Sequence, residues 1–127
     1  MTVSRWTTLD RITSVEPGTS ATAIRNVPNT LAIFDSHFPR FPTLPGVLIL
    51  GSLGELGAVL LERETDVRWR MAGADRVGFR HFVQPGDQLE LRVTLKQRSD
   101  SDAVLAGEVS VEGKLVTRAR KIRMVPR

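Results

Sequence analysis

Residues 35–50 read DSHFPRFPTLPGVLIL, a proline-rich segment that leads directly into an apolar run. Prolines stand at every third position, at 39, 42 and 45. Each proline fixes its own φ and favours an extended conformation in the residue before it, so the segment is predicted to be stiff and non-helical. Pro45 suits the first position of a helix, and we predict that this helix continues to about Glu64.

The predicted helix is apolar nearly all round rather than along one stripe, which is typical of a buried helix. It also contains three glycines, Gly51, Gly54 and Gly57. Each glycine costs up to about 1 kcal/mol of helix stability relative to alanine. We therefore expect sheet backbone, a partner subunit or a ligand to approach the helix closely at these positions.

Strand-like segments flank this helix on both sides. Turn signals at Pro17-Gly18, Pro85-Gly86 and Glu112-Gly113 separate them, and the strict apolar–polar alternation of residues 89–96 is typical of a half-buried antiparallel strand. The predicted strands cover residues 5–15, 19–27, 67–71 with 76–83, 89–96, 103–111 and 114–124. This order predicts an α+β fold, in which the sheet curls around the helix or a second subunit covers it.

Length and composition restrict the function. The length of 127 residues (14.1 kDa) predicts a single domain over residues 1–127. The composition, with 41% hydrophobic and 25% charged residues, is that of a globular protein and excludes a chain that is disordered throughout. The absence of cysteine excludes disulfides, thiolate nucleophiles and cysteine zinc sites. The two histidines, His37 and His81, are too few for a histidine-rich metal site, so we expect neither a metal nor a cofactor.

Charge and hydropathy indicate the kind of partner. A formal net charge of +4 favours an acidic partner or substrate, and no basic helix, zinc module or aromatic stacking platform in the sequence points to nucleic acid. The start of the chain contains no signal-peptide-like run, and the longest apolar run, residues 47–50, is far below the roughly 20 residues that span a bilayer. We expect a soluble, cytoplasmic protein with no membrane partner.

Two features of the opening stretch are suited to catalysis. The prolines hold His37 at a fixed distance from the helix, and rigid placement suits a general base, although a packed or surface histidine is the ordinary alternative. At the helix start, the N–H groups of Gly46 and Val47 lack intrahelical partners at the positive end of the helix dipole. These donors either polarise a substrate carbonyl or bind water or Thr43, and the sequence leaves both open.

Three blocks of sequence together carry a family resemblance. LDRI with VEPG and SA lies upstream, HFPxxPxxPGVL lies in the middle, and FR..V.PGDQLEL lies downstream. In this order they resemble the hotdog-fold β-hydroxyacyl-acyl-carrier-protein dehydratases of fatty-acid and polyketide synthesis, over roughly residues 8–97. The resemblance implies a curved antiparallel sheet wrapped around one long central helix, and dimers joined through sheet edges with active sites at the subunit interface.

The resemblance also implies roles for individual residues. His37 would remove the α proton of an acyl thioester, and the N–H of Gly46 would polarise the thioester carbonyl. An acidic residue on the central helix of the other subunit would protonate the departing hydroxyl. The implied substrate is an acyl chain that phosphopantetheine links to an acyl carrier protein, and the implied enzyme is a lyase.

The chain departs from the family pattern at Gly51, where the family has its acid and where glycine cannot donate a proton. We expect a related hotdog subunit to supply the carboxylate in a heterodimer. A second explanation is that Glu55 replaces the missing acid within a homodimer, although this shifts the carboxyl group by about 5 Å. The structural alternative for Glu55 is a buried carboxylate that is hydrogen-bonded across the subunit interface. A third is that the chain is a non-catalytic acyl-binding or heterodimer-stabilising subunit, and a hotdog thioesterase is a further variant.

Overall fold

The computed structural model describes residues 8–28, 46–63 and 65–127, which form one helix and a six-stranded sheet. In chain order the elements are β1 (Arg11–Glu16), β2 (Ser20–Asn26), α2 (Gly46–Glu62), β3 (Trp69–Phe79), β4 (Gln88–Arg98), β5 (Ala103–Val111) and β6 (Lys114–Pro126). This order of two strands, a helix and four strands confirms the predicted α+β class.

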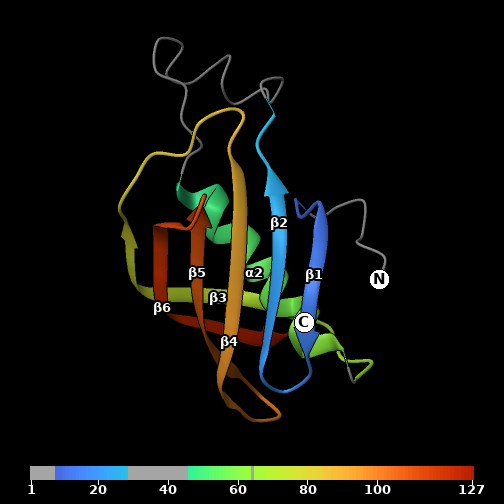
Figure 1. The fold of residues 1–127 in the computed structure, drawn as a ribbon. Coiled ribbons are helices and arrows are strands. Elements are labelled where there is room, and N and C mark those ends of the chain that lie inside the picture. The colour runs from blue at the N-terminus through green and yellow to red at the C-terminus, as the bar shows by residue number, and fades with distance from the viewer. Residues whose placement is uncertain (1–7, 29–45, 64) are drawn as a thin grey trace.

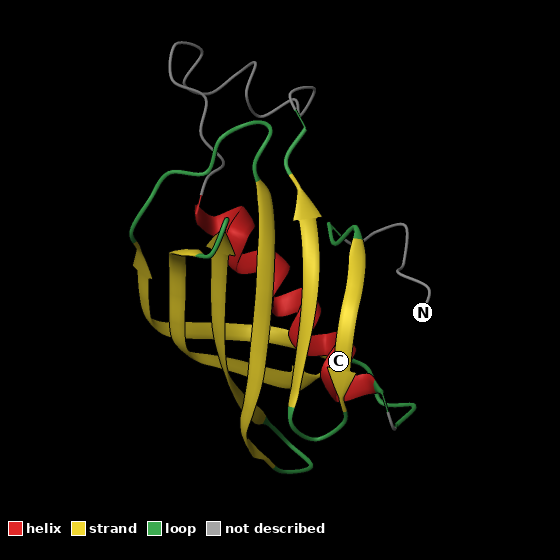
Figure 2. Cartoon of the chain, in the orientation of Figure 1, coloured by secondary structure: helices red, strands yellow, loops and turns green. Residues whose placement is uncertain are grey.

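The strands pair antiparallel in the order β1-β2-β4-β5-β6-β3. Figure 1 shows that the sheet bends strongly, so that β3 runs across the direction of β2 and β4. The long helix α2 lies in the hollow of this sheet (Figures 1 and 2). The curved sheet around a central helix is therefore confirmed.

Alternation along the strands explains which face of the sheet receives the helix. On β4, Leu89, Leu91 and Val93 are almost fully buried while Glu90 and Arg92 between them are exposed. A period of two places every second side chain on one face, so the apolar row faces α2 and the charged row faces outward. Ala21 and Ala23 form the corresponding buried row on the neighbouring strand β2.

The apolar helix is buried on the sheet side but not completely. Leu53, Leu56 and Leu61 are fully buried, whereas Val47 is 71% and Leu48 37% exposed in this chain. The sheet of this one chain therefore buries most of the helix but leaves its first turn exposed. One sheet can cover only the faces of a helix that it encloses, and the amino end of α2 lies where that cover stops.

The close approach predicted for the helix glycines is found at Gly54 but not at Gly51. A Cβ placed on Gly54 would lie 3.1 Å from the Cβ of Met71 on β3, and one on Gly57 would meet Leu105 and Met124 at ordinary contact distance, 3.4 Å. At Gly51 no described atom lies within 4 Å of such a Cβ. Side chains of the sheet, rather than its backbone, therefore approach the helix.

Several boundaries differ from the sequence predictions. Within the described part, the first strand begins at Arg11 rather than residue 5, and the helix ends at Glu62 rather than Glu64. The two extended segments 67–71 and 76–83 form one strand, β3, because pairing with β6 continues through an irregularity between Met71 and Gly73. The predicted Glu112-Gly113 turn is confirmed, with positive φ at both residues as a tight two-residue hairpin turn requires.

The carboxyl end of α2 is held by an arginine from β4. Nη2 of Arg98 donates a hydrogen bond to the Leu61 carbonyl (3.2 Å), and its guanidinium lies 5.3 Å from the ring centre of the buried Trp69. A register irregularity between Leu95 and Gln97 breaks the alternation of β4 just before this arginine. Arg98 therefore satisfies a carbonyl that has no partner within the helix.

We predict that Arg98→Met lowers the free energy of unfolding by about 1 kcal/mol, because one hydrogen bond and one cation–π contact are lost. Urea unfolding of the purified chain measures the change. Arg92→Met, an exposed arginine on the same strand, serves as the control and should stay within about 0.5 kcal/mol of the wild type. Equal values for the two variants would contradict the assignment.

Candidate functional site

The amino end of α2 begins at Gly46 and is packed against an aromatic ring. A Cβ placed on Gly46 would lie 2.6 Å from Cε1 of Phe79, at the end of β3, so no larger residue fits here without moving that ring. Phe79 itself is 52% exposed. Glycine therefore lets the helix start lie directly against the edge of the sheet.

The first turn of α2 presents backbone donors with little charge compensation. A helix leaves its first N–H groups without intrahelical partners, and here those groups begin at Gly46 and Val47. The first turn of α2 holds no acidic residue that would offset the positive end of the dipole. This arrangement suits the binding of a carbonyl or an oxyanion.

Of the two predicted catalytic side chains, the structure describes Glu55 but not His37. His37, together with the proline-rich segment that carries it, lies outside the described residues. Glu55 lies on α2 one turn beyond Gly51, and its side chain is half-buried. Among the described parts of the chain, no group of three or more His, Asp or Glu side chains is placed to hold a metal ion.

The carboxylate of Glu55 is bound by the segment before β1. Its Oε2 accepts hydrogen bonds from the backbone N–H of Thr8 (2.7 Å) and from the Thr8 hydroxyl (3.2 Å). The same hydroxyl lies 2.6 Å from Oγ of Ser52, one turn earlier on the helix. Glu55 therefore fastens the N-terminal segment to the helix, which is an ordinary structural task for a carboxylate.

A buried arginine completes this cluster from the sheet side. Arg25 on β2 is only 5% exposed, and its Nη1 donates to Oγ of Ser52 (2.8 Å) and to the Leu48 carbonyl (3.3 Å). Ser52, 1% exposed, also donates to the Leu48 carbonyl (3.3 Å). These contacts join β2 to the amino-terminal half of α2, and we call Thr8, Arg25, Leu48, Ser52 and Glu55 the polar cluster.

Burial lowers the pKa of the Arg25 guanidinium, because removal from water disfavours its charged form. The negative charges of Glu55 and Asp10 act in the opposite direction and raise that pKa. An arginine nevertheless stays protonated in proteins, so α2 packs against a buried positive charge. A buried cation is costly unless it is compensated, and the polar cluster supplies hydrogen bonds to Ser52 and to the Leu48 carbonyl together with the nearby negative charge of Glu55.

Sequence reasoning did not identify Arg25, Ser52 or Thr8. One signal was available, because Arg25 shares its strand face with Ala21 and Ala23, and a charged residue at a core-facing position needs a partner. The identity of that partner could not be read from the sequence. Leu48 and Ser52 follow Arg25 by 23 and 27 residues and meet it only in the folded chain.

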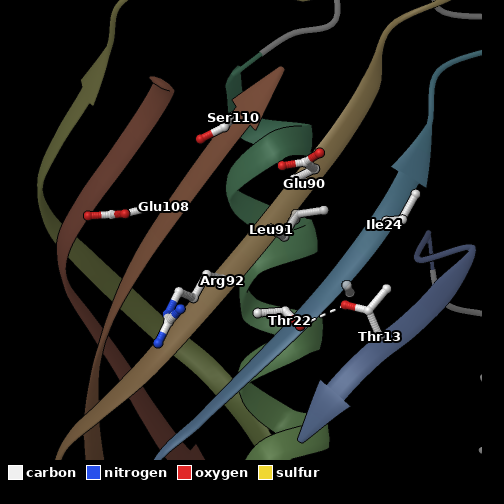
Figure 3. Close-up of a pocket in the computed structure, with 9 residues that line it drawn as sticks. Thr13, Thr22, Ile24, Glu90, Leu91, Arg92, Glu108 and Ser110 are labelled. Atoms are coloured by element: carbon white, nitrogen blue, oxygen red, sulfur yellow. Dashed lines mark hydrogen bonds between the residues drawn. The ribbon is translucent and has the colours of Figure 1, made fainter. Parts of the chain in front are cut away.

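A hollow among the described residues lies on the other face of the sheet. It has a volume of about 430 Å³ and is lined by Thr13, Thr22, Ala23, Ile24, Glu90, Leu91, Arg92, Glu108 and Ser110. Figure 3 shows the side chains of Glu90, Arg92 and Glu108 on the strands in front of the helix. The hollow is open and contains none of the predicted site residues, so we place the candidate site at the amino end of α2.

Residues 4–120, nearly the whole chain, match the FabA-like domain family. The chain belongs to the FabA-like family. Within it, 3-hydroxyacyl-acyl-carrier-protein dehydratase FabZ of Geobacillus thermodenitrificans is 40% identical over 111 residues, which cover 85% of this chain and 77% of that protein. FabZ of Bacillus subtilis is 38% identical over 111 residues, which cover 85% and 79%.

Solved structures show the same hotdog fold. A chain of the dehydratase heterocomplex ApeI:P from Xenorhabdus doucetiae superposes with a TM-score of 0.77 at 15% identity, covering 94% of this chain and 82% of that one. A Streptococcus mutans protein bound to acetyl CoA gives 0.76 at 13% identity, covering 98% and 93%. At such identities the likeness establishes the fold alone.

Basic side chains lie on β6 and directly after β3. Arg80 directly follows Phe79, whose ring lies against Gly46. Arg120, Lys121 and Arg123 are exposed on β6, the strand that pairs with β3. Arg118 on the same strand forms a surface ion pair with Glu108 (3.2 Å), which contributes little to stability.

Among the described residues, α2 is too short to be a candidate membrane-spanning helix, and no other helix is a candidate.

We predict that Ser52→Ala lowers the free energy of unfolding by about 2 kcal/mol. It removes a hydrogen bond to a buried charged group, worth about 1.5–3 kcal/mol, while the better helix propensity of alanine returns about 0.5 kcal/mol. Denaturant unfolding tests this against Ser110→Ala, a half-buried serine of the outer hollow that should change stability by less than about 0.5 kcal/mol. A Ser52→Ala chain as stable as the control would show that the polar cluster contributes nothing.

Proposed function

We propose that this chain removes water from 3-hydroxyacyl groups carried by an acyl carrier protein, as one subunit of a hotdog dehydratase of fatty-acid synthesis. The comparisons support a dehydratase of this kind, because FabZ proteins at about 40% identity match most of the chain. The observation that carries the mechanism is the amino end of α2, which begins at Gly46 against the Phe79 ring and holds no acidic residue in its first turn.

The reaction breaks two bonds on neighbouring carbons. In our proposal the imidazole of His37 removes the proton from the carbon next to the thioester carbonyl, which leaves an enolate. The N–H groups of Gly46 and Val47 stabilise the negative oxygen of this enolate. The C–O bond of the hydroxyl then breaks, and the leaving hydroxide takes up a proton to give water and a 2-enoyl thioester.

The last step needs a proton donor, and we propose that a different hotdog subunit supplies it. Gly51 stands where the family pattern has its acid, so this chain has no carboxylate at that position to offer to another subunit, and a partner's helix would have to supply the acid to the site that contains His37. Glu55 lies one helical turn farther along the helix, and Thr8 already holds its carboxylate. The related fold of the Xenorhabdus doucetiae dehydratase heterocomplex supports an assembly of unlike subunits.

The carrier protein is the proposed partner at the entrance of the site. The exposed basic residues of β6, together with Arg80, would attract the acidic surface of such a protein and raise its association rate. The phosphopantetheine arm would then reach the amino end of α2. The cytoplasmic location, the absence of a cofactor and the single-domain organisation remain predictions.

We predict that the purified chain alone is nearly inactive on a 3-hydroxyacyl-acyl-carrier-protein substrate and becomes active when mixed with a related hotdog subunit that carries the family acid. Loss of one acid–base group costs about 10²–10⁴-fold, so the mixture should exceed the lone chain by at least 10²-fold. Formation of the enoyl product is followed by its ultraviolet absorbance.

Presenting the same acyl group on free pantetheine should raise KM if the carrier protein contributes to binding.

Two variants and the type of activity found separate the explanations. His37→Ala should abolish activity in the mixture while circular dichroism stays unchanged; undiminished turnover would remove His37 from the mechanism. If the lone chain is active and Glu55→Gln abolishes that activity, Glu55 is the acid. If neither the chain nor any mixture is active, the dehydratase proposal is wrong and an acyl-binding subunit is the remaining explanation. If thioester hydrolysis is found instead, the chain is a thioesterase.

We predict that Gly51→Glu makes the chain active without a second kind of subunit, because it restores a proton donor at the family position. No atom of residues 8–28, 46–63 or 65–127 obstructs a Cβ at Gly51, so the variant should fold and should exceed the wild-type chain by about 10²-fold in kcat. Gly51→Gln is the matched control, since it fills the same space without an ionisable proton. Equal activity of the two variants would contradict the prediction.

A further inference from the structure

Arg25 lies at a position where an apolar side chain would be expected. It follows Ala21 and Ala23 on the helix-facing side of β2 and is buried like them. Its guanidinium lies against the amino-terminal half of α2, where it binds a backbone carbonyl. Burial of a charged group opposes stability, which points to a role other than packing.

The contacts of Arg25 converge on one point of the helix. Nη1 bonds the Leu48 carbonyl and the Ser52 hydroxyl, which themselves lie 3.3 Å apart. Leu48 follows Gly46 by two residues, about 3 Å along the helix axis. Arg25 therefore binds α2 within about one or two turns of the backbone donors of Gly46 and Val47.

The rest of the polar cluster keeps the arginine in place. Thr8 bonds Ser52 from the other side, and Glu55 binds Thr8 and attracts the guanidinium. The backbone N–H of Asn26, next to Arg25 on β2, donates to the carboxylate of Asp10, which also attracts the guanidinium (N–H to Oδ2, 2.5 Å). Three segments distant in sequence, the residues before β1, strand β2 and helix α2, thus meet at this cation.

We propose that Arg25 is a positioning residue for the dehydration reaction: by binding the Leu48 carbonyl and Ser52 it fixes the first turn of α2, so that the N–H groups of Gly46 and Val47 stay aimed at the thioester oxygen. This inference rests on the proposed function. Donors that stabilise a transition-state oxygen must be fixed before the reaction, and displacement by about 1 Å can cost up to 10²-fold. An exposed first turn, with Val47 facing solvent, needs such an anchor.

The test compares Arg25→Met with Arg98→Met in the active assembly. Both arginines donate to a backbone carbonyl of α2, Arg25 near the amino end and Arg98 at the carboxyl end, so the second is a matched control. Arg25→Met should lower kcat about 10-fold or more with KM within about threefold, since the donors act mainly in the transition state. Arg98→Met should leave both constants within about twofold, even where its thermal stability is lower.

Two further measurements separate positioning from general stability. Arg25→Lys should recover most of kcat, because an ammonium group can also donate to Ser52 and the Leu48 carbonyl. Amide hydrogen exchange should become faster at residues 50–52 in Arg25→Met and at residues 60–62 in Arg98→Met. Unchanged kcat in Arg25→Met, or equal losses of kcat in both methionine variants, would overturn the proposal.

Hydrogen exchange also distinguishes this proposal from the proposed function. If no wild-type assembly catalyses dehydration, the proposed function is wrong, and exchange alone then decides whether Arg25 fixes the first turn. Faster exchange confined to residues 50–52 supports the anchoring role. A uniform increase along α2, or none, overturns it.

Discussion

The structure depends on enclosing one apolar helix in a single sheet. The 17 residues of α2 carry leucines on several faces, and only strong curvature of the six strands brings enough side chains around them. Gly107 on β5 shows how tight the enclosure is, because a Cβ there would lie 2.9 Å from Ile122 and 3.0 Å from Leu53. A strand can approach the helix this closely only where a side chain is missing.

The same enclosure determines where chemistry can occur. The sheet covers the middle and carboxyl end of α2, where Leu56 and Leu61 are fully buried, but leaves Val47 exposed at the amino end. A helix exposes its unpaired N–H groups at that end, so the open part of the fold coincides with the helix end that we propose binds the thioester oxygen. In this family fold, packing and site placement follow from one constraint.

The polar cluster is an exception within an otherwise apolar interface. A hydrocarbon side chain at position 25 would cover α2 at lower cost, whereas the arginine needs Ser52, the Leu48 carbonyl and nearby carboxylates to offset its burial. Glu55 belongs to this network through Thr8. A carboxylate that was a candidate acid in the sequence thus has a structural task in the fold.

The sequence by itself determined the helix, the hairpin turns and the family, because each depends on neighbouring residues: the apolar run after Pro45, the alternation of β4, and Glu112-Gly113. It did not determine which glycine of α2 is contacted, since Gly51 and Gly54 look alike in the chain, yet only Gly54 meets Met71. Nor did it reveal that Arg25 binds Leu48 and Ser52. Only the tertiary structure decided these points, because such contacts depend on the curvature of the sheet, which brings distant residues together and which local patterns do not encode.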